Sequence, residues 1–207
     1  MPRPPDPRLA AGKYRLRAHE YDATARRTMR LRERAHALLD LRPGETVLDA
    51  GCGTGLSLPA LAAAVGPAGR VFGFDVSGEM LGLARRRVAA LGNVALMESP
   101  AEDVALPGKF QAALFFFTHD VLQSPRALER LFSHAAPGAR VVLAGAKHPS
   151  RWLLPLRLYR LLKARPWVTT LHGLDRPWAG TERYLPGLEV RPAMLGTVYL
   201  ASGRTPA

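Results

Sequence analysis

Short apolar runs and helical stretches alternate along most of this 207-residue chain, and this alternation limits the fold more than any other feature. Runs rich in β-branched or aromatic residues lie at 46–50, 70–74, 93–98, 110–117 and 139–145, with helical patterns between them at about 56–65, 77–91 and 124–135. Strands that alternate with helices form a parallel sheet that is covered on both faces, so the strands are apolar along their whole length. The sequence therefore predicts an α/β, doubly wound and mostly parallel sheet with helices on both faces.

Both ends of the chain depart from this alternation. The apolar runs 188–195 and 196–203 meet at Gly196 and predict an antiparallel C-terminal hairpin, which brings the sheet to seven strands. Upstream of the first strand, Leu31, Ala35 and Leu38 recur at helical spacing, and we expect arginines on the opposite face.

The domain organisation follows from these patterns. We expect residues 1–9 to be disordered, residues 10–43 to form a basic helical lid and residues 44–207 to form the main domain. Within it, residues 149–187 predict a basic amphipathic helix followed by a substrate-side loop.

The net charge of +12 is concentrated in the two ends of the chain. Residues 1–43 carry 11 Lys/Arg against 5 Asp/Glu, residues 151–207 carry 9 against 3, and the residues between them carry 9 against 9. Basic flanks around a neutral centre indicate contact with phospholipid, nucleic acid or an acidic substrate. Solvated arginine-rich faces are the alternative, and the sequence leaves both open.

Cys52 is the only cysteine, which excludes an intramolecular disulfide and a cysteine-based zinc site; we expect no metal. The first nine residues lack the apolar core of a signal peptide, and no run approaches the ~20 apolar residues that cross a bilayer. The expected location is cytoplasmic, with peripheral contact at the inner membrane face left open.

The run "VLDAGCGTGLS", residues 47–57, places glycines where the first strand should turn into a helix. A mononucleotide phosphate loop would need Lys after Gly55, but Leu56 stands there. A dinucleotide loop has G-x-G-x-x-G spacing, whereas this loop is G-x-G-x-G, and Asp49 would face the pyrophosphate unfavourably. An acid at this position suits a cationic ligand with a free ammonium, and S-adenosylmethionine has an ammonium, a sulfonium and no phosphate.

Asp75 ends the second strand, 24 residues beyond Gly51. This is close to the spacing of about 20 residues at which a carboxylate binds a ribose diol in such folds. The spacing predicts a ribose ligand for Asp75, and a turn or helix-capping acid is the alternative.

Five segments in order, "VLDAGCGTG", "GFDVS", "NVALMESPAEDVALP", "FQAALFFFTHD" and "HAAPGARVVLAG", resemble the motifs of class I S-adenosylmethionine-dependent methyltransferases. The resemblance covers about residues 44–145 and implies a Rossmann-like fold with S-adenosylmethionine as cofactor. The cofactor-binding residues that it implies are Tyr21, Asp49, Gly51, Cys52, Gly53, Gly55, Asp75, Val76, Met80, Ser99, Ala101, Glu102, Phe117 and Thr118.

The resemblance also implies how these residues divide the cofactor among them. The residues of the glycine loop surround the methionine part of the cofactor, together with the carbonyl groups of Phe117 and Thr118. Val76 and Met80 pack the adenine. The family often has an Asp that binds the adenine amino group, whereas this chain has "ESPAED" at that place. Ser99, the Ala101 backbone and Glu102 are therefore the candidates for this contact. Cys52 is expected to act only as a small residue, and Tyr14, His19 and Tyr21 are lid candidates.

The candidate catalytic residues, His119 and Asp120, follow the fourth strand. A His beside an Asp at the ligand edge could take a proton from the acceptor. Alternatively, Asp120 or Ser124 caps the next helix and His119 lines the pocket.

The predicted acceptor contacts are His148, His172 and Trp178. An aromatic wall there would favour amines through cation–π contact. The chain lacks the motifs of enzymes that methylate base amines, pyrimidine carbons, arginine or catechols, which leaves small molecules, lipids and less typical RNA. The C-terminal third is loosely similar to phospholipid headgroup N-methyltransferases.

We therefore expect in-line transfer of the methyl group to a nitrogen, or to an oxygen, of a small-molecule or lipid-headgroup acceptor. The alternatives are an RNA methyltransferase that uses the basic flanks and a regulatory protein that binds S-adenosylmethionine without turnover.

Overall fold

The computed structural model describes residues 26–148, 169, 170 and 172–207, and the single positions 6, 9, 12 and 22. The expected lid residues Tyr14, His19 and Tyr21 lie outside these ranges, as does the expected basic helix over 149–167. In the part of the chain that is described, no helix has the length and apolarity needed to cross a membrane.

The described elements alternate as the sequence predicts. The strands are β1 (Thr46–Ala50), β2 (Arg70–Asp75), β3 (Val94–Glu98), β4 (Phe110–Phe116), β5 (Ala135–Ala146), β6 (Glu189–Ala193) and β7 (Val198–Arg204). The helices are α3 (Met29–Leu39), α4 (Leu58–Val65), α5 (Gly78–Arg87), α6 (His119–Leu122) and α7 (Pro125–Phe132), with short 3-10 turns η1 (Arg26–Thr28) and η2 (Ala179–Thr181).

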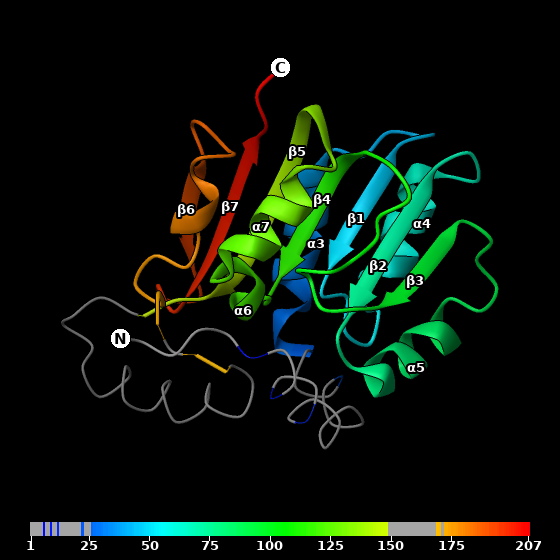
Figure 1. The fold of residues 1–207 in the computed structure, drawn as a ribbon, viewed down its shortest axis with the longest axis horizontal. Coiled ribbons are helices and arrows are strands. Elements are labelled where there is room, and N and C mark those ends of the chain that lie inside the picture. Colours follow the sequence, from blue (N-terminus) through cyan, green and yellow to red (C-terminus); the bar gives the residue numbers. More distant parts are fainter. Residues whose placement is uncertain are drawn as a thin grey trace.

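The seven strands form one sheet in the order β3-β2-β1-β4-β5-β7-β6 (Figure 1). The first five strands are parallel, and β7 lies antiparallel to β5 and to β6. This confirms the predicted Rossmann-like sheet and the C-terminal hairpin. The chain moves outward from β1 in one direction to β2 and β3, and in the other to β4 and β5. The ligand position in such a sheet is the carboxyl edge at this switch point between β1 and β4.

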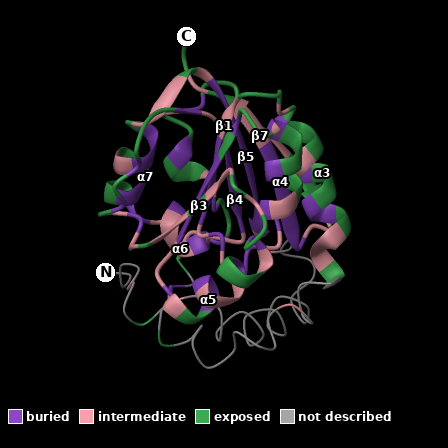
Figure 2. Ribbon diagram, turned by 90° about the vertical axis from the view of Figure 1, so that its right-hand side faces the viewer, coloured by how far each residue is buried: buried purple, intermediate pink, exposed green. Residues whose placement is uncertain are grey.

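Two apolar cores cover the two faces of the sheet (Figure 2). Helices α3, α4 and α5 pack on one face, and α7 packs on the other together with residues 101–106 and Tyr199. Alternate residues of a strand point to opposite faces, so Val47 faces α3 and α4 whereas Leu48 faces α7. By the same alternation, Asp49 lies on the α3 face.

The buried face of helix α3 differs from the prediction. Leu31 and Ala35 are buried as predicted, but Leu38 is 37% exposed and Leu39 is buried in its place. Arg32, expected on the solvent side, is only 5% exposed. The buried stripe therefore runs through positions 31, 35 and 39, with Arg32 beside it, because the guanidinium finds partners against the sheet.

Candidate functional site

The glycine loop after β1 turns on three residues with positive φ: +66° at Gly51, +57° at Gly53 and +78° at Gly55. A Cβ on Gly51 would lie 2.6 Å from Thr118 Cγ2, and one on Gly55 would lie 2.8 Å from Leu58 Cδ1. A Cβ on Gly53 would meet no atom within 4 Å. The outer two glycines are thus required by packing, whereas the middle one leaves backbone open to a ligand.

Asp75 ties this loop to the end of β2. Gly53 N–H donates to Asp75 Oδ2 at 2.9 Å, and Ser77 N–H donates to Oδ1 at 2.9 Å. Burial raises the pKa of Asp75, while these two N–H groups and that of Val76 lower it. The loop and the carboxylate predicted to bind ribose are therefore held in one fixed arrangement.

Asp49 lies beneath the loop and is 2% exposed. Burial raises its pKa to about 7, against the lowering effect of the positive charge of Arg32; Asp75 raises it further. Arg32 reaches this place from α3, with its guanidinium carbon 4.0 Å from the centre of the Phe116 ring. Its Nη1 donates to Ser57 Oγ at 2.5 Å. A buried acid and a buried cation thus share the α3 face of the sheet.

Three buried polar atoms at the carboxyl edge have no hydrogen-bond partner within the described part of the chain: Asp49 Oδ2, Thr118 Oγ1 and His119 Nδ1. Asp49 lies in β1, one residue before its end, and Thr118 and His119 follow β4, which pairs with β1. Buried polar atoms are nearly always bonded in folded proteins. Acceptor atoms left over at the switch point of the sheet fit a ligand that brings hydrogen-bond donors, such as an ammonium group.

The backbone between β4 and α6 has an unusual conformation. Phe117 has φ +60°, which is uncommon for a residue with a side chain. Its N–H donates to Ala144 O at 2.7 Å and so continues the pairing of β4 with β5. The turn brings Thr118 against Gly51. Carbonyl contacts from Phe117 and Thr118 to a ligand stay a prediction.

His119 is buried at the start of α6, and its Nε2 lies 2.9 Å from His172 O. Because a carbonyl oxygen can only accept, Nε2 carries the proton and Nδ1 presents its lone pair. Burial lowers the pKa of His119 and the adjacent Asp120 raises it. The imidazole is thus arranged as a neutral base.

Asp120 holds the chain at Thr169. Thr169 donates to Asp120 Oδ2 through its N–H and through its hydroxyl, each at 2.9 Å. Ser124, not Asp120, caps the next helix: its Oγ accepts from Ala127 N–H at 3.3 Å. These bonds give Asp120 a role in holding the loop that contains His172, and its catalytic role stays a prediction.

The predicted adenine contacts are only partly available. Ser124 Oγ donates to Glu102 Oε1 at 2.5 Å, and Ser99 Oγ donates to Pro100 O at 2.9 Å. Ala101 and Met80 are buried. Glu102 is therefore engaged in fixing the start of α7, which leaves backbone groups near Ala101 as the simpler donors to a ligand.

Two further predicted residues have packing roles. Cys52 Sγ lies in the core against Gly73, where an added Cβ would be 3.1 Å from the sulfur. Burial raises the pKa of this thiol well above its ordinary value, so it stays protonated. The Trp178 ring packs on Tyr199, with 4.9 Å between ring centres. Among the acceptor candidates, the His148 N–H donates to Leu174 O at 2.8 Å.

Like the contacts of Arg32, those that join the N-terminal segment to the glycine loop were not predicted from the sequence. Thr54 Oγ1 donates to Asp22 Oδ1 at 2.7 Å, and Arg87 pairs with Asp22 Oδ2 at 2.5 Å. Arg87 also donates to Thr54 O. No local pattern marks Asp22 or Arg87. Arg32 precedes Ala35 by three residues, a spacing that places both on one face of a helix, and this is the one sequence signal for the burial of Arg32.

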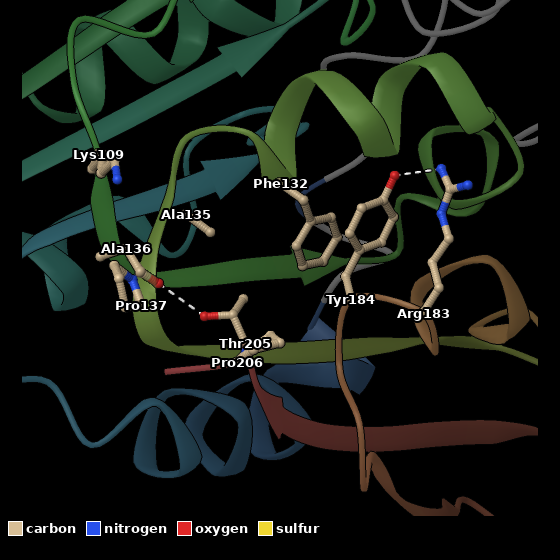
Figure 3. Close-up of a pocket in the computed structure, with 9 residues that line it drawn as sticks. All are labelled: Lys109, Phe132, Ala135, Ala136, Pro137, Arg183, Tyr184, Thr205 and Pro206. Atoms are coloured by element: carbon tan, nitrogen blue, oxygen red, sulfur yellow. Dashed lines mark hydrogen bonds between the residues drawn. The ribbon is translucent and has the colours of Figure 1, made fainter.

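A hollow of about 270 Å³ lies at the opposite edge of the sheet, where β4 and β5 begin (Figure 3). Figure 3 shows Phe132 and Tyr184 side by side, with 4.3 Å between their ring centres, and Lys109 and Arg183 at the two ends of the hollow. It contains none of the predicted site residues. The candidate site is therefore the carboxyl edge, which is defined by its orphaned polar atoms.

Comparison with known proteins finds methyltransferases. Residues 47–138 match a family model described as "Methyltransferase domain". A demethylmenaquinone methyltransferase of Symbiobacterium thermophilum is 36% identical over 162 residues, which cover 65% of this chain and 62% of the relative. A 2-phytyl-1,4-naphtoquinone methyltransferase of Thermosynechococcus vestitus is 34% identical over 113 residues, which cover 54% of this chain and 50% of the relative. The chain thus spans less than two thirds of either relative's length.

Solved structures share the fold. An S-adenosylmethionine-dependent methyltransferase of Aquifex aeolicus superposes with a TM-score of 0.59 at 23% identity, covering 84% of this chain and 89% of that one. The N-methyltransferase NodS of Bradyrhizobium japonicum, in complex with S-adenosylhomocysteine, superposes with a TM-score of 0.60 at 18% identity, covering 85% and 87%. At these identities the similarity shows the architecture of the sheet and its helices.

Proposed function

We propose that this chain, which contains a class I S-adenosylmethionine-dependent methyltransferase domain, transfers a methyl group to a small acceptor that carries a lipid tail. Domains of this class take the methyl group from S-adenosylmethionine. The two curated relatives are named for quinones, one of them phytylated, and this supports a lipid-linked ring as the acceptor. The amine or hydroxyl of a lipid headgroup, expected from the sequence, is the competing acceptor.

One observation carries the proposal: Asp49 Oδ2 and Thr118 Oγ1 are buried and unbonded within the described part of the chain, and Thr118 lies against Gly51 of the glycine loop. An amino-acid ammonium supplies the donors that these atoms lack. A phosphate would place negative charge against Asp49, which is already near Asp75. These two acceptor atoms therefore fit S-adenosylmethionine and disfavour a nucleotide.

Each residue then has a definite task. Asp49 and Thr118 accept from the ammonium of the cofactor, and Asp75 accepts from the ribose hydroxyls with the lone pairs that Gly53 and Ser77 do not use. Val76 and Met80 contact the adenine, and Tyr21 is retained as a predicted lid contact. Bound S-adenosylmethionine supplies an electrophilic methyl group on its sulfonium.

The protein's contribution to the reaction is mainly orientation, which can lower a barrier by roughly 7–11 kcal/mol. His119 Nδ1 has a free lone pair at the same edge and receives the proton that the acceptor loses. Asp120 acts indirectly, because it holds the loop at Thr169 that positions His172. His148, His172 and Trp178 are retained as predicted acceptor contacts.

Calorimetric titration with S-adenosylhomocysteine tests the cofactor assignment. Asp75→Asn should weaken binding at least tenfold, whereas Asp103→Asn, a matched change at a carboxylate that is 66% exposed, should stay within twofold of the unmodified protein. A wild-type affinity retained by Asp75→Asn would contradict the assignment.

Methyl-labelled S-adenosylmethionine distinguishes the acceptors. Reduced demethylmenaquinone, phosphatidylethanolamine vesicles and total RNA are offered in parallel, and label is counted in each extract. We expect incorporation into the quinone and loss of that incorporation in His119→Gln, with unchanged binding of S-adenosylhomocysteine. Label in phosphatidylethanolamine would establish the headgroup acceptor instead, and label only in RNA would refute a lipid-linked acceptor.

A further inference from the structure

The turn between β6 and β7 exposes two large apolar side chains to solvent. Leu195 is 89% exposed and Met194 is 44% exposed. Within the described ranges, the other exposed large hydrophobic residues are Leu9 and Leu38, at 39% and 37%. The two most exposed apolar side chains are therefore consecutive, which sets this turn apart from the scattered apolar residues of an ordinary surface.

The backbone of the turn makes this choice of residues more unusual. Met194 and Leu195 have φ of +47° and +57°, and Gly196 follows at +75°. Gly, Asn and Asp are the residues that normally occupy this left-handed region. The turn is nevertheless well bonded: Gly196 N–H donates to Ala193 O at 3.0 Å, and Thr197 Oγ1 donates to Met194 O at 2.7 Å. An ordered turn that keeps apolar side chains in a strained, exposed position indicates a surface that they meet.

The turn lies at the same edge of the sheet as the candidate site. β7 runs opposite to β5, and its first residue, Val198, pairs with Ala146 at the carboxyl end of β5. Lys147 N–H donates to Thr197 O at 3.0 Å, which fixes the turn to the exit of β5. Figure 1 shows β7 pointing away from the edge at which β1 and β4 end, so its beginning lies at that edge.

The chain around the turn is basic. Residues 190–201 and 143–148 contain Arg191 and Lys147 and no Asp or Glu. Arg191 pairs with Glu189 at 3.0 Å, so their charges cancel, and Lys147 supplies the net positive charge beside the turn. In the sequence, residues 149–168, which follow His148, include five Lys/Arg and no acid. The charge is complementary to an anionic surface.

We propose that Met194 and Leu195 insert into the headgroup region of an anionic phospholipid bilayer and hold the carboxyl edge of the sheet against it. Apolar side chains flanked by cations are the combination that binds this interface. The inference rests on the proposed function, because a bilayer at this edge delivers a lipid-linked acceptor directly to His119. It identifies the source of the acceptor as the membrane.

Vesicle sedimentation tests the inference on the full chain. The double variant M194N/L195N removes both apolar side chains, and asparagine tolerates the left-handed backbone, so the variant should fold at least as well. The probes are vesicles of phosphatidylcholine alone and of phosphatidylcholine with phosphatidylglycerol. The wild-type protein should bind the anionic vesicles more tightly. M194N/L195N should lose about tenfold or more of that partition, whereas the control Leu38→Asn should stay within twofold of wild type.

Wild-type partition retained by M194N/L195N would overturn the inference, and so would equal binding of the unmodified protein to both kinds of vesicle. Titration with S-adenosylhomocysteine on the same samples separates this inference from the proposed function. Retained S-adenosylhomocysteine binding without turn-dependent vesicle binding refutes only the membrane contact. Turn-dependent vesicle binding without S-adenosylhomocysteine binding supports the membrane contact and refutes the proposed function.

Discussion

Replacing Asp49 by asparagine should stabilise the ligand-free protein and weaken its binding of S-adenosylhomocysteine. Asp49 is 2% exposed, and burial raises its pKa from 3.8 to about 7. The unfolded chain therefore loses this proton near pH 4, about three pH units before the folded protein does. In that interval the folded state binds the extra proton, so stability falls as pH rises from about 4 to about 7 and then levels off.

The size of the effect follows from the pKa difference. Each unit corresponds to about 1.4 kcal/mol, so ionising Asp49 in the folded protein costs about 4 kcal/mol in all. About 2–3 kcal/mol of this falls between pH 5 and pH 8. Asparagine has nearly the same shape and does not titrate. The stability gained by Asp49→Asn should therefore be larger at pH 8 than at pH 5 by about 2–3 kcal/mol.

Urea denaturation followed by circular dichroism, with both proteins in the same two buffers, gives the free energies of unfolding. The comparison between proteins cancels groups that titrate in both. Calorimetry with S-adenosylhomocysteine on the same samples should show at least tenfold weaker binding by Asp49→Asn. Equal stability differences at pH 5 and pH 8 would refute the burial argument, and unchanged affinity would refute the pairing of Asp49 with the ligand's ammonium.

Three more outcomes are expected. Gly51→Ala should lower the free energy of unfolding by about 2 kcal/mol or more, because the added Cβ would lie 2.6 Å from Thr118 Cγ2. Adding Thr118→Ser removes that methyl group and should restore part of the lost stability. If urea denaturation shows no restored stability in the double variant, the clash is not the cause. Burial lowers the pKa of His36 to about 4, so the folded protein should lose stability as pH falls from about 6.5 towards 4. An acid titration in which His36→Gln loses the same stability as the unmodified protein would show that His36 is not the cause. Asp22→Asn weakens the contact with Arg87. It should speed amide hydrogen exchange in residues 51–57 and change the free energy of unfolding by less than about 1 kcal/mol. Unaltered exchange would mean that the contact does not order the loop.

The strands could be predicted from the sequence because each is a short apolar run that ends at turn residues. The first strand was predicted at 46–50, as observed for Thr46–Ala50. The fifth strand begins earlier than predicted, at Ala135, because that residue pairs with Phe110 before the register shifts. Pro137 and Gly138 indicate a turn by their residue types, and only pairing with a distant strand carries the chain through them as part of β5.

The interior of the site was harder to predict because its contacts join distant segments. Arginine is rarely buried without a partner, so a solvent-facing position was the natural expectation for Arg32. Its partners, Ser57 and Phe116, come from two other parts of the chain. Similarly, Asp120 binds Thr169 at a separation of 49 residues. The sequence motif locates the glycine loop, but it does not reveal which charges are buried beneath it.

The position of β7 also sets the order in which the sheet can be finished. β7 pairs with β5 on one side and with β6 on the other, although it follows both of them in the chain. Until Val198–Arg204 has been synthesised, the outer edge of β5 and the inner edge of β6 both lack their partner. Such open edges recruit strands from other molecules. We therefore expect folding during synthesis to wait for this strand, and chains cut short before it to aggregate instead of forming a smaller sheet.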